Sequence, residues 1–258
     1  MYIVSIVNQK GGVAKTTTTA NIGACLAARG FRTLLIDLDP QANLTLGVRR
    51  EWDGLPYGLH NVLLDVEESP LSGIIRQVGD MPLFLAPGNV EMSLTEALLV
   101  PLVDSVFRLK HALTDLARTE AFDFILLDCP PSLGRLTQNA LVASTHLLVP
   151  TEARFYSFAG IDTLNKMVSG LRKNLQVEIE LLGVVITMFE RGTRMHRMIA
   201  DEIRERFGTT LFDTVIYKNV RLSEAEIEGK PIILFDKKAR GARDYEALTE
   251  ELLRRTGK

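Results

Sequence analysis

A segment rich in glycine and lysine, residues 8–17, constrains the fold of this chain more than any other part of the sequence. Its letters are NQKGGVAKTT, and it lies between an apolar run at residues 2–7 and a helix-like run at residues 18–29. A buried strand, a glycine-bearing turn and a helix in this order direct backbone N–H groups and the positive end of the helix dipole toward one point. The segment is therefore predicted to bind an anion, with Lys15 contacting the β- and γ-phosphates of a nucleotide and Thr16 ligating Mg²⁺. The alternative is a Gly-Gly turn with two solvated lysines, and the strand and helix on either side argue against it.

The composition is that of an ordinary soluble globular protein. The 258 residues are 46% apolar and 24% charged, with a formal net charge of −2. No run of about eighteen apolar residues occurs, and Met1 leads into the first apolar run without a basic segment, so neither a membrane span nor a signal peptide is expected. The cytoplasm is the expected location. Cys25 and Cys129 lie far apart in apolar contexts, which favours buried free thiols.

Apolar runs alternate with helix-like segments along the whole chain, and this alternation predicts the fold class. After the first run, the expected strands are residues 32–37, 83–87, 122–128, 146–150 and 178–187. Strands separated by helices form a doubly wound, mostly parallel sheet with helices on both faces, an α/β fold. We expect one domain over residues 1–258. Residues 44–121 give no indication of chemistry.

Carboxylates follow two of the expected strands. The letters DLDPQ run from Asp37 through Asp39, and Asp128 ends the clearest central strand and is followed by Cys-Pro-Pro-Ser. Because parallel strands end at one edge of a sheet, these acids are expected beside the anion site, where they would handle Mg²⁺ and water. Asp128 fits a second Mg²⁺ carboxylate that acts through water. Taken alone, either segment could be an ordinary turn.

The phosphate-binding segment departs from the generic pattern GxxxxGK[ST], which requires glycine where this chain has Gln9 and Ala14. It matches the variant KGGxxKT and so resembles the ParA/MinD group of P-loop ATPases, which have a deviant Walker A motif. The group usually has glycine at the position of Ala14, so this backbone position is expected to tolerate a negative φ and the loop to be slightly stiffer than usual.

The resemblance implies that ATP and Mg²⁺ are the cofactors. It also implies that Lys10 reaches across a dimer interface to the phosphates of the partner's nucleotide. The nucleotide-binding residues implied by the resemblance are Lys10, Gly11, Gly12, Val13, Ala14, Lys15, Thr16, Thr17 and Asn219.

Two further segments carry the resemblance. The DxDPQ segment resembles the first switch of the group, whose second aspartate, here Asp39, orients or activates the attacking water. The DxPP segment that starts at Asp128 resembles the second switch, whose paired prolines set the path of the backbone. The implied metal-binding residues are Thr16, Asp39 and Asp128, and the implied catalytic residues are Lys10, Lys15 and Asp39.

A C-terminal segment resembles the ParA proteins more than their MinD-like relatives. Residues 215–225, VIYKNVRLSEA, resemble the ParA signature IPRNVRLxEA. In ParA proteins this loop lies beside the adenine, and the arginine that matches Arg221 contributes to DNA binding. Tyr217 and Lys218 replace proline and arginine of the signature, Glu226 replaces a proline, and Gly192 stands where the family often has a DNA-contacting arginine.

Because the net charge of −2 does not indicate a nucleic-acid binder, any DNA contact must come from a local C-terminal patch. The expected DNA-contacting residues are Arg191, Arg194, Lys218 and Arg221. Each arginine, taken alone, could equally be a solvated side chain.

The whole pattern predicts a ParA-type ATPase that hydrolyses ATP to ADP and phosphate. The resemblance implies an ATP-dependent homodimer, or sandwich, that binds duplex DNA without sequence preference and hydrolyses ATP slowly until a ParB-type protein activates it. Such a protein would serve chromosome or plasmid partitioning and would be cytoplasmic and nucleoid-associated. Because the phosphate-binding segment begins near residue 8, no room is expected for the N-terminal helix-turn-helix domain of some plasmid ParA proteins.

Two alternatives remain open at this stage. One is a MinD-like regulator that positions a protein or membrane cargo, although no amphipathic tail follows the terminal helix to anchor it, so no membrane contact is expected. The other is a biosynthetic enzyme on the same fold that phosphorylates a small carboxylate, for which no acceptor-binding motif stands out.

Overall fold

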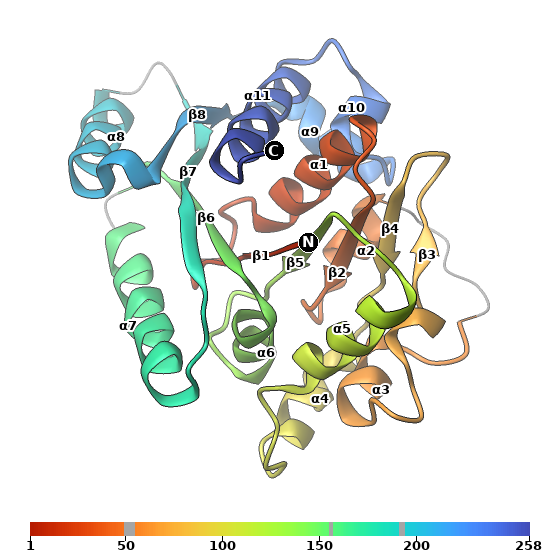
Figure 1. Cartoon of the computed structure of the whole chain (residues 1–258). Coiled ribbons are helices and arrows are strands. Elements are labelled where there is room, and N and C mark those ends of the chain that lie inside the picture. Colours follow the sequence, from red (N-terminus) through yellow and green to blue (C-terminus); the bar gives the residue numbers. More distant parts are fainter. Residues whose placement is uncertain (49–54, 155–156, 191–193) are drawn as a thin grey trace.

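The computed structural model describes residues 1–48, 55–154, 157–190 and 194–258. Within these residues an eight-stranded sheet forms the centre of the molecule, in the order β3-β4-β2-β5-β1-β6-β7-β8 (Figure 1). Neighbouring strands are parallel except for the edge pair β3 and β4, which is antiparallel. The predicted doubly wound, mostly parallel α/β fold is confirmed.

The element bounds agree with the main strands expected from the sequence to within two residues. The strands are β1 Tyr2–Ile6, β2 Thr33–Asp37, β3 Arg76–Gln77, β4 Leu83–Ala86, β5 Phe124–Asp128, β6 His146–Glu152, β7 Glu180–Phe189 and β8 Leu211–Tyr217. The helices are α1 Lys15–Ala28, α2 Asn43–Val48, α3 Leu59–Leu64, α4 Met92–Leu99, α5 Arg108–Thr119, α6 Arg135–Ala143, α7 Ser157–Leu175, α8 Arg194–Phe207, α9 Val220–Ile227, α10 Ile232–Phe235 and α11 Arg240–Arg255.

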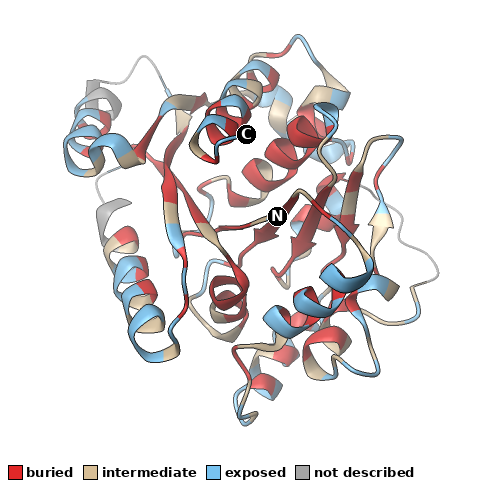
Figure 2. Cartoon of the chain, viewed as in Figure 1, coloured by how far each residue is buried: buried red, intermediate tan, exposed pale blue. Residues whose placement is uncertain are grey.

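Apolar residues on both faces of the central strands build two cores. Successive side chains of a strand point to opposite faces, so a strand covered on both sides is expected to be mostly apolar. In β5, Ile125 and Leu127 belong to the core under α3, α5 and α6, whereas Phe124 and Leu126 belong to the core under α1 and α11. Figure 2 shows the result, with buried central strands, a largely buried α1 beside them, and outer helices such as α5 that bury one face and expose the other. Cys25 and Cys129 are buried free thiols, as expected.

The register of the central strands brings their carboxyl ends to one level. Ile6 of β1 and Asp37 of β2 both pair with Asp128 of β5. The loops that follow these three strands therefore start side by side, at one edge of the sheet. Within the described residues, no helix combines the length and the apolar character that crossing a bilayer requires.

Candidate nucleotide-binding site

The loop between β1 and α1 turns through two residues with left-handed backbone. Gly12 has φ 72° and Ala14 has φ 60°, and Ala14 directly precedes the first residue of α1. The expectation of a negative φ at Ala14 is therefore wrong. The chain has to change direction between the loop and the helix at this residue, and the backbone adopts the left-handed conformation even though the alanine Cβ makes it unfavourable by roughly 1–2 kcal/mol.

Lys15 lies at the start of α1 and is buried. Its Nζ donates to the backbone carbonyl of Lys10 at 3.3 Å, so the ammonium lies across the loop. Burial lowers the pKa of Lys15, and the carboxylates of Asp128 and Asp39 act in the opposite direction. A cation with few other partners at the N-terminus of a helix attracts phosphate strongly, because charge and helix dipole have the same sign.

Asp128 is fully buried at the end of β5, and two threonine hydroxyls of α1 bind it. Thr16 Oγ1 donates to Asp128 Oδ2 at 2.8 Å, and Thr19 Oγ1 donates to Asp128 Oδ1 at 3.2 Å. Burial raises the pKa of Asp128 well above its ordinary value, and the nearby Asp37 raises it further. Thr16 and Asp128, both expected at the metal site from the sequence, are therefore in direct contact.

Asp39 lies close to this pair but is fixed separately. It is buried, and its Oδ1 accepts a hydrogen bond from the backbone N–H of Gln41 at 3.0 Å. Thr16 and the carboxylates offer the hard oxygen ligands that Mg²⁺ prefers, so the donor set fits this ion. No group of three or more His, Cys, Asp or Glu side chains among the described residues could hold a metal alone. A magnesium ion here would therefore need phosphate and water oxygens as well.

Asp37 has a structural role that the sequence did not reveal. Asp37 Oδ2 accepts hydrogen bonds from the backbone N–H and the hydroxyl of Thr45 at 2.8 and 2.6 Å. Thr45 Oγ1 in turn accepts a hydrogen bond from the backbone N–H of Gly88 at 2.9 Å. Of the two acids in DLDPQ, Asp39 lines the cavity described next and Asp37 anchors α2 below it.

A cavity of about 640 Å³ lies over these groups. It is lined by Gly11, Gly12, Ala14, Lys15, Thr16, Thr17, Asp39, Gln41, Asn43, Leu46, Gly47, Pro131, Ser223, Glu226 and Ile227. We call it the phosphate cavity. Leu46 and Gly47 come from α2, so residues 44–121, which give no indication of chemistry in the sequence, do contribute to the site.

A second cavity of about 300 Å³ adjoins the first, and we call it the side cavity. Its lining adds Met188, Ile216, Tyr217, Lys218, Asn219, Val220, Leu222 and Tyr245. The side chain of Asn219 caps α9 by accepting a hydrogen bond from the backbone N–H of Arg221 at 2.9 Å. The two cavities together offer a polar compartment for phosphates and a more apolar one for a base.

Lys10 is engaged outside the phosphate cavity. Its Nζ lies 2.8 Å from Oε2 of Glu152, at the end of β6, and Nε of Arg154 lies 3.1 Å from the same oxygen. Lys10 is not part of the lining of either cavity. In the single chain this lysine therefore pairs with a buried acid of its own subunit.

The two expected DNA-contacting residues whose side chains are described each have acidic partners. Lys218 Nζ lies 2.8 Å from Glu190 Oε1. The guanidinium of Arg221 pairs with Glu224 and, at 3.1 Å, with Asp236, and it stacks over the ring of Phe235. Arg191 lies outside the described residues, and the side chain of Arg194, the first residue of α8, does so too.

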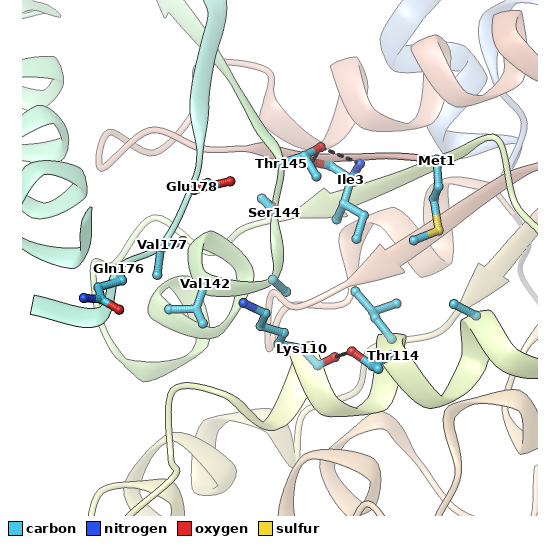
Figure 3. A pocket seen from close by; sticks show the side chains of 13 residues that line it. Met1, Ile3, Lys110, Thr114, Val142, Ser144, Thr145, Gln176, Val177 and Glu178 are labelled. Carbon is cyan, nitrogen blue, oxygen red and sulfur yellow. Dashed lines mark hydrogen bonds between the residues drawn. The ribbon is translucent and has the colours of Figure 1, made fainter. Parts of the chain in front are cut away.

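A third cavity, of about 540 Å³, lies at the opposite edge of the sheet, where β1 and β6 begin (Figure 3). Its lining comes from the start of β1, from α5 and α6, and from residues 176–178. Lys110 of α5 contributes a positive charge to this lining. Among the described residues that line it there is no glycine, so it lacks the glycine-rich loop that lies at the phosphate cavity.

Comparisons with known proteins agree with this geometry. A family model described as an AAA domain matches residues 1–181. The sporulation initiation inhibitor protein Soj of Bacillus subtilis is 40% identical over 97% of this chain and 97% of its own length. The chromosome partitioning protein ParA of Myxococcus xanthus is 36% identical over 98% of this chain and 88% of its own. The chain belongs to the ParA/Soj family of P-loop ATPases.

A solved structure extends this comparison to ligands. Cobyrinic acid a,c-diamide synthase from Mycobacterium smegmatis, with bound ADP and magnesium, is 31% identical with a TM-score of 0.84 and covers 100% of this chain and 96% of its own. The expected cofactors, ATP and Mg²⁺, are confirmed to the extent that such structures hold an adenine nucleotide with magnesium.

Glu226 and Thr45 are among the residues of this ParA/Soj member whose roles do not follow from its sequence. In the sequence Glu226 is only a departure from the family signature, and its place directly after residues 215–225 is the signal that points to the site. Thr45 had no such signal, because its partner Asp37 is recognised only once the fold brings the two together.

Proposed function

We propose that this ParA/Soj protein binds ATP with Mg²⁺ and hydrolyses it, as a single ATPase domain over residues 1–258. The observation that carries the proposal is the Thr16–Asp128 hydrogen bond beside the buried ammonium of Lys15, under a cavity bounded by the glycine-rich loop. Backbone N–H groups of residues 11–17 would cradle the phosphates, and Lys15 would contact the β- and γ-phosphates. The positions of these groups are set by three adjacent buried strands.

In the proposed chemistry, Asp128 and Asp39 have different roles because their surroundings differ. Thr16 would ligate Mg²⁺ directly and Asp128 through water, while Asp39 orients the attacking water from the rim of the same cavity. When bound with ATP, Mg²⁺ would neutralise charge that develops on the phosphate oxygens. Because Asp128 is fully buried and fixed by two hydroxyls, it has no freedom to act as a mobile base.

The active state in this proposal is an ATP-dependent homodimer in which each Lys10 contacts the partner's nucleotide. The ion pair of Lys10 with Glu152 supports this proposal, because it keeps the lysine at the surface and out of its own cavity. Arg154 would keep the carboxylate of Glu152 paired once Lys10 leaves, so the exchange would not strand a buried charge.

The proposed role of the dimer is partitioning of a chromosome or plasmid, in the cytoplasm and on the nucleoid. It would bind duplex DNA without sequence preference through Arg191, Arg194, Lys218 and Arg221, and a ParB-type protein would accelerate its slow hydrolysis. The names of its relatives, Soj and ParA, and their near full-length similarity support this assignment. Dimerisation would double the number of DNA contacts and so favour binding by avidity.

Nucleotide titration and turnover of two variants test the ATPase proposal. Lys15→Ala should lose ATP binding in calorimetry, because the cation that faces the phosphates is gone. Asp39→Ala should bind ATP with nearly unchanged affinity but hydrolyse it at least about tenfold more slowly, because only water positioning is removed. ATP binding that survives in Lys15→Ala would contradict the proposed site, and loss of binding in Asp39→Ala would assign that residue to the metal or to the fold.

One observation favours a second candidate function. A structure similar to this one bears the name of a biosynthetic enzyme, cobyrinic acid a,c-diamide synthase. A biosynthetic role predicts turnover that a small carboxylate stimulates, whereas the partitioning role predicts stimulation by a ParB-type protein and cosedimentation with DNA. The MinD-like alternative instead predicts ATP-dependent cosedimentation with lipid vesicles.

A further inference from the structure

The two cavities of the site meet at a narrow set of shared residues. Both are lined by Gly12, Ala14, Thr17, Ser223 and Glu226. Gly12, Ala14 and Thr17 belong to the loop and the first turn of α1, while Ser223 and Glu226 lie on α9. If the phosphates occupy the phosphate cavity and the base occupies the side cavity, the sugar between them must pass this junction.

Glu226 is the charged residue of this junction. Its Oε1 accepts a hydrogen bond from the hydroxyl of Thr17, and Glu226 is exposed. A glutamate is unexpected here, because the carboxylate lies next to the positive end of α1 and to the groups that would bind phosphate. It would repel a bound triphosphate unless hydrogen bonds from the ligand offset the repulsion.

We propose that Glu226 recognises the ribose hydroxyls of the bound nucleotide and makes this protein prefer ATP to deoxy-ATP. The proposal rests on the proposed function, since it requires ATP in these two cavities. An ionised carboxylate has only acceptor oxygens and can accept from the 2′- and 3′-hydroxyls together. The proline that the ParA signature has at this position offers no side-chain acceptor, so the preference belongs to this chain and not to the signature.

The position of Glu226 also predicts whether removing its carboxylate weakens or strengthens the binding of each nucleotide. In ATP the ribose hydroxyls would donate to Glu226 and offset its repulsion of the phosphates. In a deoxy nucleotide one of these hydrogen bonds is missing, and the repulsion remains. Removing the carboxylate should therefore weaken ATP binding but strengthen the binding of the deoxy nucleotide.

Calorimetric titration with ATP, 2′-deoxy-ATP and 3′-deoxy-ATP tests the proposal. The wild-type protein should bind at least one deoxy nucleotide about tenfold more weakly than ATP, which is the effect of one hydrogen bond to a charged group. The affinities of Glu226→Ala for the three nucleotides should lie within about twofold of one another. This variant should also bind the deoxy nucleotide that the wild type binds weakly more tightly than the wild type does. Glu226→Gln, which keeps one acceptor oxygen without the charge, should lie between them.

Glu228→Ala is the matched control, because Glu228 ends the same helix and lines neither cavity. It should keep the wild-type preference. Equal affinity of the wild type for all three nucleotides, or an undiminished preference in Glu226→Ala, would overturn the ribose assignment while the proposed ATPase stands. A wild-type protein that binds none of the three would overturn the proposed function, and the ribose assignment with it.

Discussion

At the scale of single residues, Ala14 holds a backbone conformation that glycine adopts more easily. Its φ of 60° is fixed by the turn into α1. Ala14→Gly should therefore raise the free energy of unfolding by up to about 1 kcal/mol, because relief of the left-handed strain exceeds the entropy that glycine adds to the unfolded chain. The control, Ala24→Gly within α1, should lower it by about 1 kcal/mol or more. Urea denaturation compares them, and equal losses in both variants would contradict the strain at Ala14.

Asp37 makes the stability of the fold depend on pH. Burial raises its pKa to about 6, although its hydrogen bonds from Thr45 and Asp39 act in the opposite direction. Between about pH 4 and pH 6 the folded protein holds a proton that the unfolded chain has lost, so stability should fall as pH rises through this window, by at most about 3 kcal/mol. Below it both states are protonated, and above it both are ionised.

Asp37→Asn removes this titration. Urea denaturation from pH 4.5 to 7 should show the wild type losing stability relative to Asp37→Asn as the pH rises. Parallel profiles of the two proteins would show that other groups cause the pH dependence.

At the scale of elements, acidic neighbours limit the DNA contacts expected of α9 and the end of β8. Arg221 pairs with Glu224 and Asp236, so part of its charge is already balanced. Glu224→Gln should strengthen DNA binding of the ATP-bound dimer several-fold, because it frees the guanidinium for phosphate. Arg221→Glu should weaken binding to all sequences equally. It should also reduce the slope of log binding constant against log salt concentration by about one unit per subunit.

Fluorescence anisotropy with duplexes of unrelated sequence, at several salt concentrations, measures both effects. Glu228→Gln, directly after the same helix, serves as a control for a general change in charge. An unchanged affinity in Glu224→Gln, or a sequence-dependent loss in Arg221→Glu, would remove Arg221 from the DNA surface.

The sequence predicted the elements that carry the strongest patterns. β1, β2 and β5 are mostly apolar runs that end at or just before motif residues, so both their positions and their common edge followed from the sequence pattern and topology. β3 has two residues, Arg76 and Gln77, which are too few to show a periodicity, and it pairs antiparallel with β4 at the edge of the sheet. The contact of Thr17 with Glu226 joins residues 209 positions apart, which no local pattern encodes. The contact of Asp37 with Thr45 spans eight positions, but it forms only when the loop after β2 turns back to start α2.

At the scale of the whole molecule, the pairing of Lys10 with Glu152 should oppose dimerisation. Lys10→Ala should bind ATP as a monomer but not dimerise, because the contact to the partner's phosphates is gone. Glu152→Gln should dimerise at lower protein concentration than the wild type, because Lys10 is released more easily. Light scattering in the presence of a non-hydrolysable ATP analogue measures the mass of each protein in solution and so distinguishes monomer from dimer. A Lys10→Ala protein that still dimerises would contradict the cross-subunit role.

The position of β1 between β5 and β6 has a consequence for how the site is observed. Backbone amides in such central strands exchange hydrogen for deuterium only when much of the molecule unfolds, whereas amides in loops exchange readily. The phosphate-binding loop therefore leaves a slowly exchanging strand and enters a helix packed on the same core. Nucleotide binding should therefore reduce deuterium uptake at residues 8–17 while uptake in β1 stays low and unchanged. The β1 amides would serve as an internal reference in the same experiment.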